Sequence, residues 1–226
     1  MIKIENIPES EVYRYLGYDE EKHILTDEMR VLVRHCIDQM LSAVEPKVVI
    51  SPLLALKREE EGIYAENFLL RGKDIKIHLD QCGEAVFMAA TLGNRIDMLI
   101  RKSEALNMAE AVIMDAAANV AIEQVCQQEE DHLREAIIAS GKYLTIRFSP
   151  GYGDFPIESG HDLLRILDAP RKIGLSVTPS HIMTPRKSIS AVMGVADIDV
   201  KGRLAGCANC VMKEKCVFRK RGTTCD

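Results

Sequence analysis

The segment RFSPGYGDFPIE, residues 147–158, combines an arginine, aromatic residues and carboxylates with glycines and prolines, and it has no helical or strand period. Short connections rarely contain so much chemistry. The planar guanidinium of Arg147 suits a ligand carboxylate, which it can bind through two parallel charge-assisted hydrogen bonds. Gly151 lets another molecule approach the backbone, whose amides suit an adenine edge, and Tyr152 can stack or hydrogen-bond. The alternative is a tight structural turn with a salt-bridged arginine.

A second group of reactive residues occupies the end of the sequence. Four cysteines are spaced Cys-x2-Cys-x5-Cys-x8-Cys, at Cys207, Cys210, Cys216 and Cys225. This pattern favours a four-thiolate site for an iron-sulfur cluster or for zinc. Neighbouring lysines and arginines would lower the thiol pKa values and attract an acidic electron carrier. The alternative is a flexible basic tail with free cysteines.

A polar stripe is predicted on the longest helix of the chain. Asp115, Asn119 and Glu123 follow one another at four-residue steps, so they lie on one helix face beside small apolar residues. Such a stripe either faces a ligand or is an ordinary solvated face. The three remaining cysteines, Cys36, Cys82 and Cys126, have no thiol neighbours in sequence and are predicted to be buried packing residues. The six histidines lack metal-ligand spacing, and we interpret them as surface or core residues.

The elements that position these residues indicate an α+β fold, with long helices packed on a mostly antiparallel sheet. Regular strand-helix-strand spacing and a dinucleotide-type glycine turn are missing from the sequence. Helices are predicted for a short segment ending at Gly17, from Thr26 to before Pro46, over 107–140, as one long helix or two with a bend, and over 159–168. Extended segments are predicted at 47–56, with Pro52 at an edge or bulge, and at 84–93, 142–148, 172–178 and 188–198.

Size and charge limit the possible functions. The 226 residues, 47% of them hydrophobic, are enough for a core in one large domain or two small lobes. We expect an α+β domain over 1–203 and a cysteine-rich appendage over 204–226. The net charge of -5 argues against nucleic acid as a partner, and no long apolar run predicts a membrane span or signal peptide. We therefore expect a cytoplasmic protein.

Residues 141–195 resemble the S-adenosylmethionine-binding activation domain of cobalamin-dependent methionine synthase. The resemblance rests on the order of several elements, which are Arg-x-x-x-Gly-Tyr at Arg147, Gly151 and Tyr152, then Pro156, the LL helix, the IGLSVTPSHIM segment, and Pro185 with the Ser188/Ser190 strand. Two positions depart from the family pattern. Gly153-Asp154-Phe155 replaces a stretch of small residues, and Met193 stands where an aromatic residue is expected.

The resemblance implies a role in reactivation. In that family, cobalamin in the inactive cob(II) state is reduced by one electron and methylated by S-adenosylmethionine, while the protein positions the reactants and excludes water. It implies Arg147 as the contact to the ligand carboxylate, Pro150 and Gly151 beside the ligand, Tyr152 facing the corrin as the catalytic residue, and Glu123 as a looser match.

The chain is too short to include cobalamin, homocysteine or folate domains as well. The resemblance therefore implies a separate partner, either a corrinoid-binding methionine synthase or another corrinoid methyltransferase, and a flavodoxin- or ferredoxin-like electron donor. The rival interpretation is a non-catalytic, metal-binding adaptor that docks on a corrinoid protein.

Overall fold

The computed structural model describes residues 3–18, 24–200 and 214. The chain divides into two compact units. The first is composed of Met1–Val49, Ala89–Asp131 and Asp168–Ile189, and the second of Ile50–Met88, His132–Leu167 and Ser190–Asp226. Each unit is therefore assembled from segments that are distant in the sequence. Within the described residues, no helix is both long enough and apolar enough to cross a membrane.

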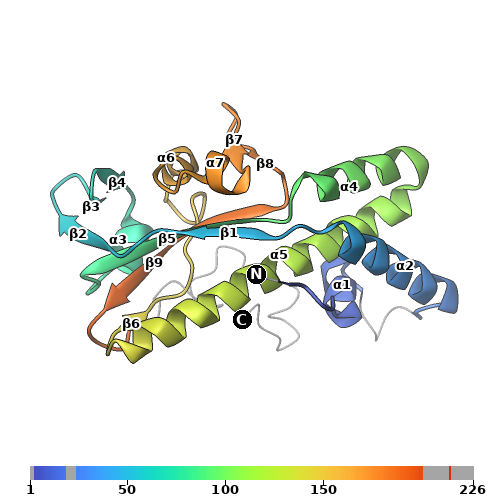
Figure 1. Cartoon of the computed structure of the whole chain (residues 1–226), viewed down its shortest axis with the longest axis horizontal. Helices are drawn as coiled ribbons and strands as arrows, with labels where there is room; N and C mark the ends of the chain where they lie inside the picture. Colours follow the sequence, from blue (N-terminus) through green and yellow to red (C-terminus); the bar gives the residue numbers. More distant parts are fainter. Residues whose placement is uncertain (1–2, 19–23, 201–213, 215–226) are drawn as a thin grey trace. The chain divides into compact units, whose positions relative to one another are not determined.

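The first unit is mainly helical (Figure 1). Its helices are α1 (Glu9–Tyr15), α2 (Asp27–Ala43), α4 (Asn94–Leu106), the first part of α5 (Met108–Ala139) and α7 (Ala169–Ile173). Helices α2 and α4 pack against each other. Strands β7 (Ser176–Val177) and β8 (Met183–Thr184) form a small antiparallel hairpin.

Local signals in the sequence account for several helix ends. The hydroxyl of Thr26 accepts the Met29 amide at 3.3 Å, which caps α2 as predicted. Helix α1 ends before Gly17, and α5 ends before Gly141, also as predicted. Helix α5 is one helix of 32 residues. Helix α4 was not predicted from the sequence.

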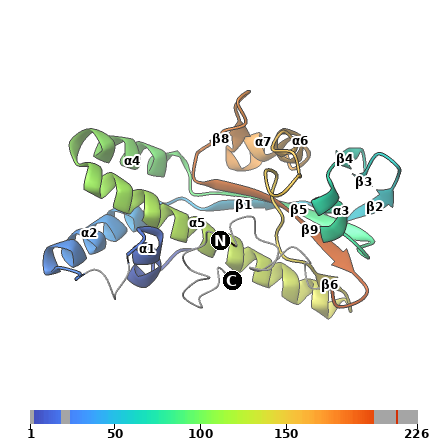
Figure 2. The same cartoon turned by 180° about the vertical axis from the view of Figure 1, so that it is seen from behind.

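The second unit is built on an antiparallel sheet (Figure 2). Its elements are β2 (Leu54–Arg58), β3 (Ile63–Ala65), β4 (Phe68–Leu70), α3 (Lys73–His78), most of β5 (Glu84–Thr91), β6 (Tyr143–Leu144), α6 (Ser159–Ile166) and most of β9 (Ser188–Ala196). The strand order is β4-β3-β2-β5-β9-β6, and β1 (Lys47–Ile50) also pairs with β5. Strand β5 is almost entirely buried, as its apolar sequence predicts.

This architecture confirms the predicted α+β class. The boundaries of some extended segments are shorter than expected, because residues 142–148 form only the two-residue strand β6 and one isolated bridge at Phe148. Pro52 lies in the break between β1 and β2, where it does not have to donate a ladder hydrogen bond. Pro170 follows α6 and lies in the first turn of α7.

Candidate functional site

Arg147 lies in a bulge at the start of the RFSPGYG loop. Leu144 pairs with Val195 and Phe148 pairs with Val192, so the three residues 145–147 lie opposite only the two residues 193–194 of β9. An extra residue of this kind turns side chains away from the regular alternation of a strand, and such bulges are common beside functional sites. The direction of the half-buried Arg147 side chain is therefore set by the bulge, and not by the regular alternation of a strand.

The loop that follows is a compact turn held by its own backbone. The Gly151 amide donates to the Phe155 carbonyl at 2.8 Å, and the Phe155 amide donates back to Tyr152 at 3.0 Å. The Tyr152 amide donates to Ser149 at 3.1 Å. The φ of Gly151 is 92°, a left-handed conformation that favours glycine. Because the Gly151 and Tyr152 amides are used within the loop, these two donors are not the ones that read an adenine edge.

The Tyr152 ring is displayed at the surface on an aromatic support. Tyr152 is 58% exposed, and its ring lies edge-on to Phe148 with the centroids 6.0 Å apart. Phe148 is also stacked with Phe155, at 6.0 Å, and with His78, at 4.9 Å. Edge-on and offset-stacked contacts of this kind are favourable aromatic geometries. Phe148 is thus the common neighbour of one exposed ring and two buried ones.

His78 is fully buried beneath this group. Its Nε2 lies 3.0 Å from the Thr145 hydroxyl, which also accepts the Gly194 amide at 2.8 Å. We assign the single proton of the Thr145 hydroxyl to the Ile146 carbonyl, 3.1 Å away, and this assignment makes His78 Nε2 the donor to Thr145. Burial lowers the pKa of His78 to about 4, against a smaller opposite effect of the Ile146 carbonyl. The imidazole is therefore neutral at physiological pH.

We expect this histidine to make stability depend on pH. The unfolded chain binds a proton on His78 below its ordinary pKa of 6.5, whereas the folded chain does so only near pH 4. Unfolding therefore becomes easier as the pH falls from 6.5 to 4, and the contribution of His78 at the acid end is about 3 kcal/mol. Urea unfolding at pH 7.5 and 4.5 should show a smaller acid loss in His78→Gln than in the parent. An equal loss in both proteins would contradict this assignment.

Asp154 holds the loop to the start of α3. Its carboxylate accepts the amides of Lys73 at 2.7 Å and Asp74 at 2.9 Å, and Asp74 in turn accepts the Asp154 amide at 3.2 Å. These amides lower the pKa of Asp154. Gly153 has a φ of 54°, and a Cβ there would collide with the Asp74 carboxylate. The departure from the family pattern at Gly153-Asp154 is thus explained by an anchor within the chain.

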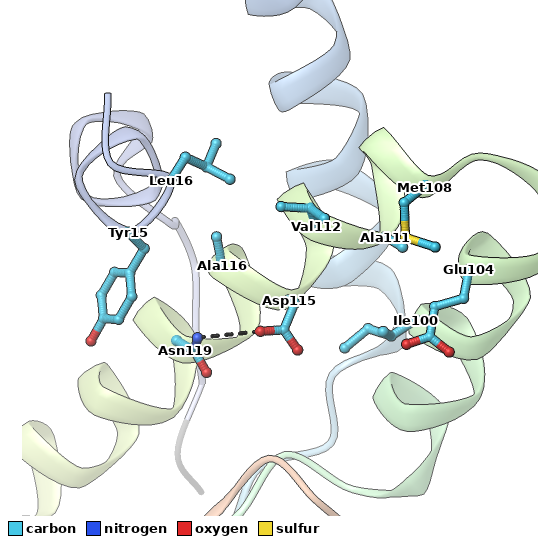
Figure 3. Close-up of a pocket in the computed structure, with 10 residues that line it drawn as sticks. All are labelled: Tyr15, Leu16, Ile100, Glu104, Met108, Ala111, Val112, Asp115, Ala116 and Asn119. Carbon is cyan, nitrogen blue, oxygen red and sulfur yellow. Dashed lines mark hydrogen bonds between the residues drawn. The ribbon is translucent and has the colours of Figure 1, made fainter. Parts of the chain in front are cut away.

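The polar stripe of α5 borders two hollows in the first unit. The larger, of about 340 Å³, lies among α1, α4 and α5 (Figure 3) and includes Tyr15, Asp115 and Asn119 in its wall. The second, of about 260 Å³, includes Tyr15, Asn119 and Glu123. Burial, and to a lesser extent the charge of Glu123, raises the pKa of Tyr15. The stripe therefore lines concave surface rather than an open helix face.

Lys187 ties part of this stripe together. Its ammonium lies 2.7 Å from the Asp115 carboxylate and 2.7 Å from the Asn119 side-chain oxygen, and it also reaches the Asp115 carbonyl at 3.3 Å. The Lys187 side chain is only 13% exposed, so the pair is shielded from solvent on one side. Asp115 and Asn119 are thus fixed in position, while Glu123 is the member of the stripe that contributes only to the second hollow.

The four tail cysteines, Cys207, Cys210, Cys216 and Cys225, lie outside the described residues. Among the residues that the structure does describe, no cluster of histidine, cysteine or carboxylate side chains is arranged to hold a metal ion. The prediction for the remaining cysteines is confirmed, because Cys36, Cys82 and Cys126 are all buried.

The structure adds residues that the sequence did not single out. Arg147, Pro150, Gly151 and Tyr152 come together in one loop of the second unit, as their spacing implies, whereas Glu123 belongs to the first unit. His78 and Lys187 were not predicted as part of a site. Each makes its key contact with a partner 67 or 68 residues away, Thr145 and Asn119 respectively, and no local pattern indicates such a pair.

Comparison with known proteins agrees with this fold. The model of the family described as "Vitamin B12 dependent methionine synthase, activation domain" matches residues 86–198, which is half of the chain. A solved structure, "Crystal Structure of the MetH Reactivation Domain bound to AdoHcy", superimposes with a TM-score of 0.64 and 16% sequence identity. That match covers 93% of this chain and 80% of the other. No curated protein matches the sequence. The matched half contains the bulge, the RFSPGYG loop and the stripe of α5, and the chain belongs to the vitamin B12 dependent methionine synthase activation domain family.

Proposed function

We propose that this chain binds S-adenosylmethionine through the loop that begins at Arg147 and delivers its methyl group to a corrinoid held by a separate protein. The client is a cobalamin-dependent methionine synthase or another corrinoid methyltransferase. The observation that carries the proposal is the geometry of this loop, in which an arginine in a bulge is followed by an exposed tyrosine on a buried aromatic support. The related solved structure contains AdoHcy, the product that remains when S-adenosylmethionine loses its methyl group.

The proposed chemistry has two steps, a one-electron reduction and a methyl transfer. One electron from a flavodoxin- or ferredoxin-like donor converts cob(II)alamin to cob(I)alamin on the client. The reduced cobalt then attacks the sulfonium methyl carbon, the cobalt-carbon bond forms, and the sulfur keeps the electron pair of the broken bond. The products are methylcobalamin and S-adenosylhomocysteine. The methyl transfer removes the reduced cobalt as it forms, and this draws the unfavourable reduction forward.

Each named residue has a separate part in this proposal. Arg147 pairs with the carboxylate of S-adenosylmethionine, because its fork of donors matches two carboxylate oxygens. Pro150 and Gly151 provide backbone close to the ligand, and Tyr152 faces the corrin and shields the reacting atoms from water. Glu123 is proposed as a further ligand contact on the basis of the family resemblance.

Substitution of Tyr152 tests whether this residue serves methyl transfer more than ligand binding. Because Tyr152 is assigned to the corrin side, Tyr152→Ala should slow cobalamin methylation while changing S-adenosylmethionine affinity much less. Calorimetric titration gives the affinity, and the visible spectrum of the corrinoid follows methylation under reducing conditions. Tyr143, which is 41% exposed on β6, supplies the control Tyr143→Ala. Equal losses in both measurements would place Tyr152 in the ligand pocket instead.

The same titration tests the proposal as a whole. Micromolar binding of S-adenosylmethionine by the parent protein would support the enzyme. An absence of binding at millimolar ligand would favour the adaptor, which docks on a corrinoid protein and stabilises one of its conformations.

A further inference from the structure

The ring of His78 is the buried end of a column of aromatic contacts that reaches the surface. His78 stacks on Phe148 with an interplanar angle of 22° and a centroid distance of 4.9 Å. Phe148 in turn meets Tyr152 edge-on, with an interplanar angle of 90°. All three residues belong to the second unit. The column therefore connects a fully buried imidazole to a tyrosine that is 58% exposed.

Polar contacts fix the imidazole at the base of this column. Thr145 accepts its Nε2 proton, and the same hydroxyl accepts the amide of Gly194, which lies in β9 opposite the bulge. The other ring nitrogen, Nδ1, has no hydrogen-bond partner among the described residues. A buried ring nitrogen without a partner is unfavourable, and a phenyl ring would fill the same space without this cost. If this side chain only filled the core, histidine would thus be less favourable here than phenylalanine.

We propose that His78 is a positioning residue, which sets the plane of Phe148 and thereby holds the Tyr152 ring in its exposed orientation. The bond to Thr145 prevents the imidazole from rotating, and the flat face of the ring then orients Phe148 by stacking. Because Phe148 contacts the Tyr152 ring edge-on, a fixed Phe148 plane also restricts the orientation of the Tyr152 ring. The consequence for methyl transfer rests on the function proposed above, whereas the mechanical claim about Tyr152 does not.

A tryptophan placed at position 152 reports on this claim directly. The chain contains no tryptophan, so Tyr152→Trp creates a single fluorophore in the loop. In this background, time-resolved anisotropy should show a ring that moves mainly with the whole protein. His78→Leu removes the stacking face and should add a fast local component, together with stronger quenching by acrylamide. Phe148→Leu should reproduce both changes, since it removes the middle of the column.

Two further variants distinguish positioning from general loss of stability. His78→Phe keeps a flat ring but loses the bond to Thr145, so it should fall between the parent and His78→Leu. Ile63→Val shortens a side chain that is 3% exposed in β3, and it should leave the anisotropy unchanged. A ring at position 152 that stays equally immobile in the folded His78→Leu and Phe148→Leu proteins would overturn the inference. If His78→Leu does not fold, His78→Phe decides the question, because it removes the bond to Thr145 while keeping Phe148; a ring at position 152 as immobile as in the parent would then overturn the inference.

Methylation assays on the variants that retain Tyr152 extend the test to function. In His78→Leu the methylation rate should fall while S-adenosylmethionine affinity stays unchanged, and this split is not expected from a purely structural defect. If the parent itself neither binds S-adenosylmethionine nor methylates a corrinoid, the proposed function fails. The fluorescence result would still decide the role of His78, so the two failures are distinguishable.

Discussion

Arg147→Ala should weaken S-adenosylmethionine binding by about 10- to 150-fold, which corresponds to about 1.5 to 3 kcal/mol for lost hydrogen bonds to a charged group. The reason is the proposed two-point pairing between the guanidinium and the ligand carboxylate. Arg147→Lys should recover little of the loss, because an ammonium cannot reproduce the fork. Calorimetric titration at fixed pH and salt measures the dissociation constants of the three proteins.

Arg165 provides the matched control for this experiment. It lies in α6 of the same unit, pairs with Asp162 at 3.1 Å, and its side chain is 74% exposed. Arg165→Ala removes the same charge from the protein and should leave the affinity unchanged. A folded Arg147→Ala protein that binds as tightly as the parent would mean that the bulge and loop are structural features only.

Replacement of Cys207 or Cys210 by alanine should abolish metal binding by the tail, because each removes one of four thiolates from the predicted site. Protein purified without oxygen should be coloured and contain about four irons per chain if the site holds a cubane cluster. Elemental analysis gives the metal content of the parent and variants, and the visible spectrum gives the absorption of a cluster. The spacing of the four cysteines is compatible with both iron-sulfur and zinc, so the metal content chooses between a redox site and a structural one.

The three buried cysteines are the controls for the tail. Cys126 lies in α5 and is fully buried, so Cys126→Ala should keep the metal content of the parent. One zinc and no colour would exclude an electron relay through the tail. A metal-free protein that reactivates its client at the normal rate would contradict both the iron-sulfur site and the zinc site in the tail.

The sequence predicted those parts of the fold that have local causes. Thr26 marks the start of α2 and Gly141 follows the end of α5, because a cap and a helix stop act within a few residues. Helix α4 was missed although Ile96 and Ile100 are buried at a helical spacing. Its remaining buried position is a serine, Ser103, so the apolar signal in this segment is weak.

The candidate site was predictable only where its residues are close in sequence. Arg147 and Tyr152 share one loop, and the family pattern singles them out. The bulge was not predictable, because it depends on the register between residues 143–148 and β9. The role of Asp154 likewise required knowledge that the start of α3, about 80 residues earlier, would be its partner. Contacts of this kind are decided by tertiary packing.

The burial of the body cysteines has a practical consequence for thiol chemistry. Burial raises the pKa of Cys36 and of Cys82 to about 11, so at neutral pH almost none of either group is in the nucleophilic thiolate form. Cys126 is fully buried as well. Any rapid alkylation of the folded protein by a maleimide must therefore come from the other four cysteines. Counting the modified thiols by mass spectrometry, before and after a metal is added, thus measures occupancy of the tail without mutation.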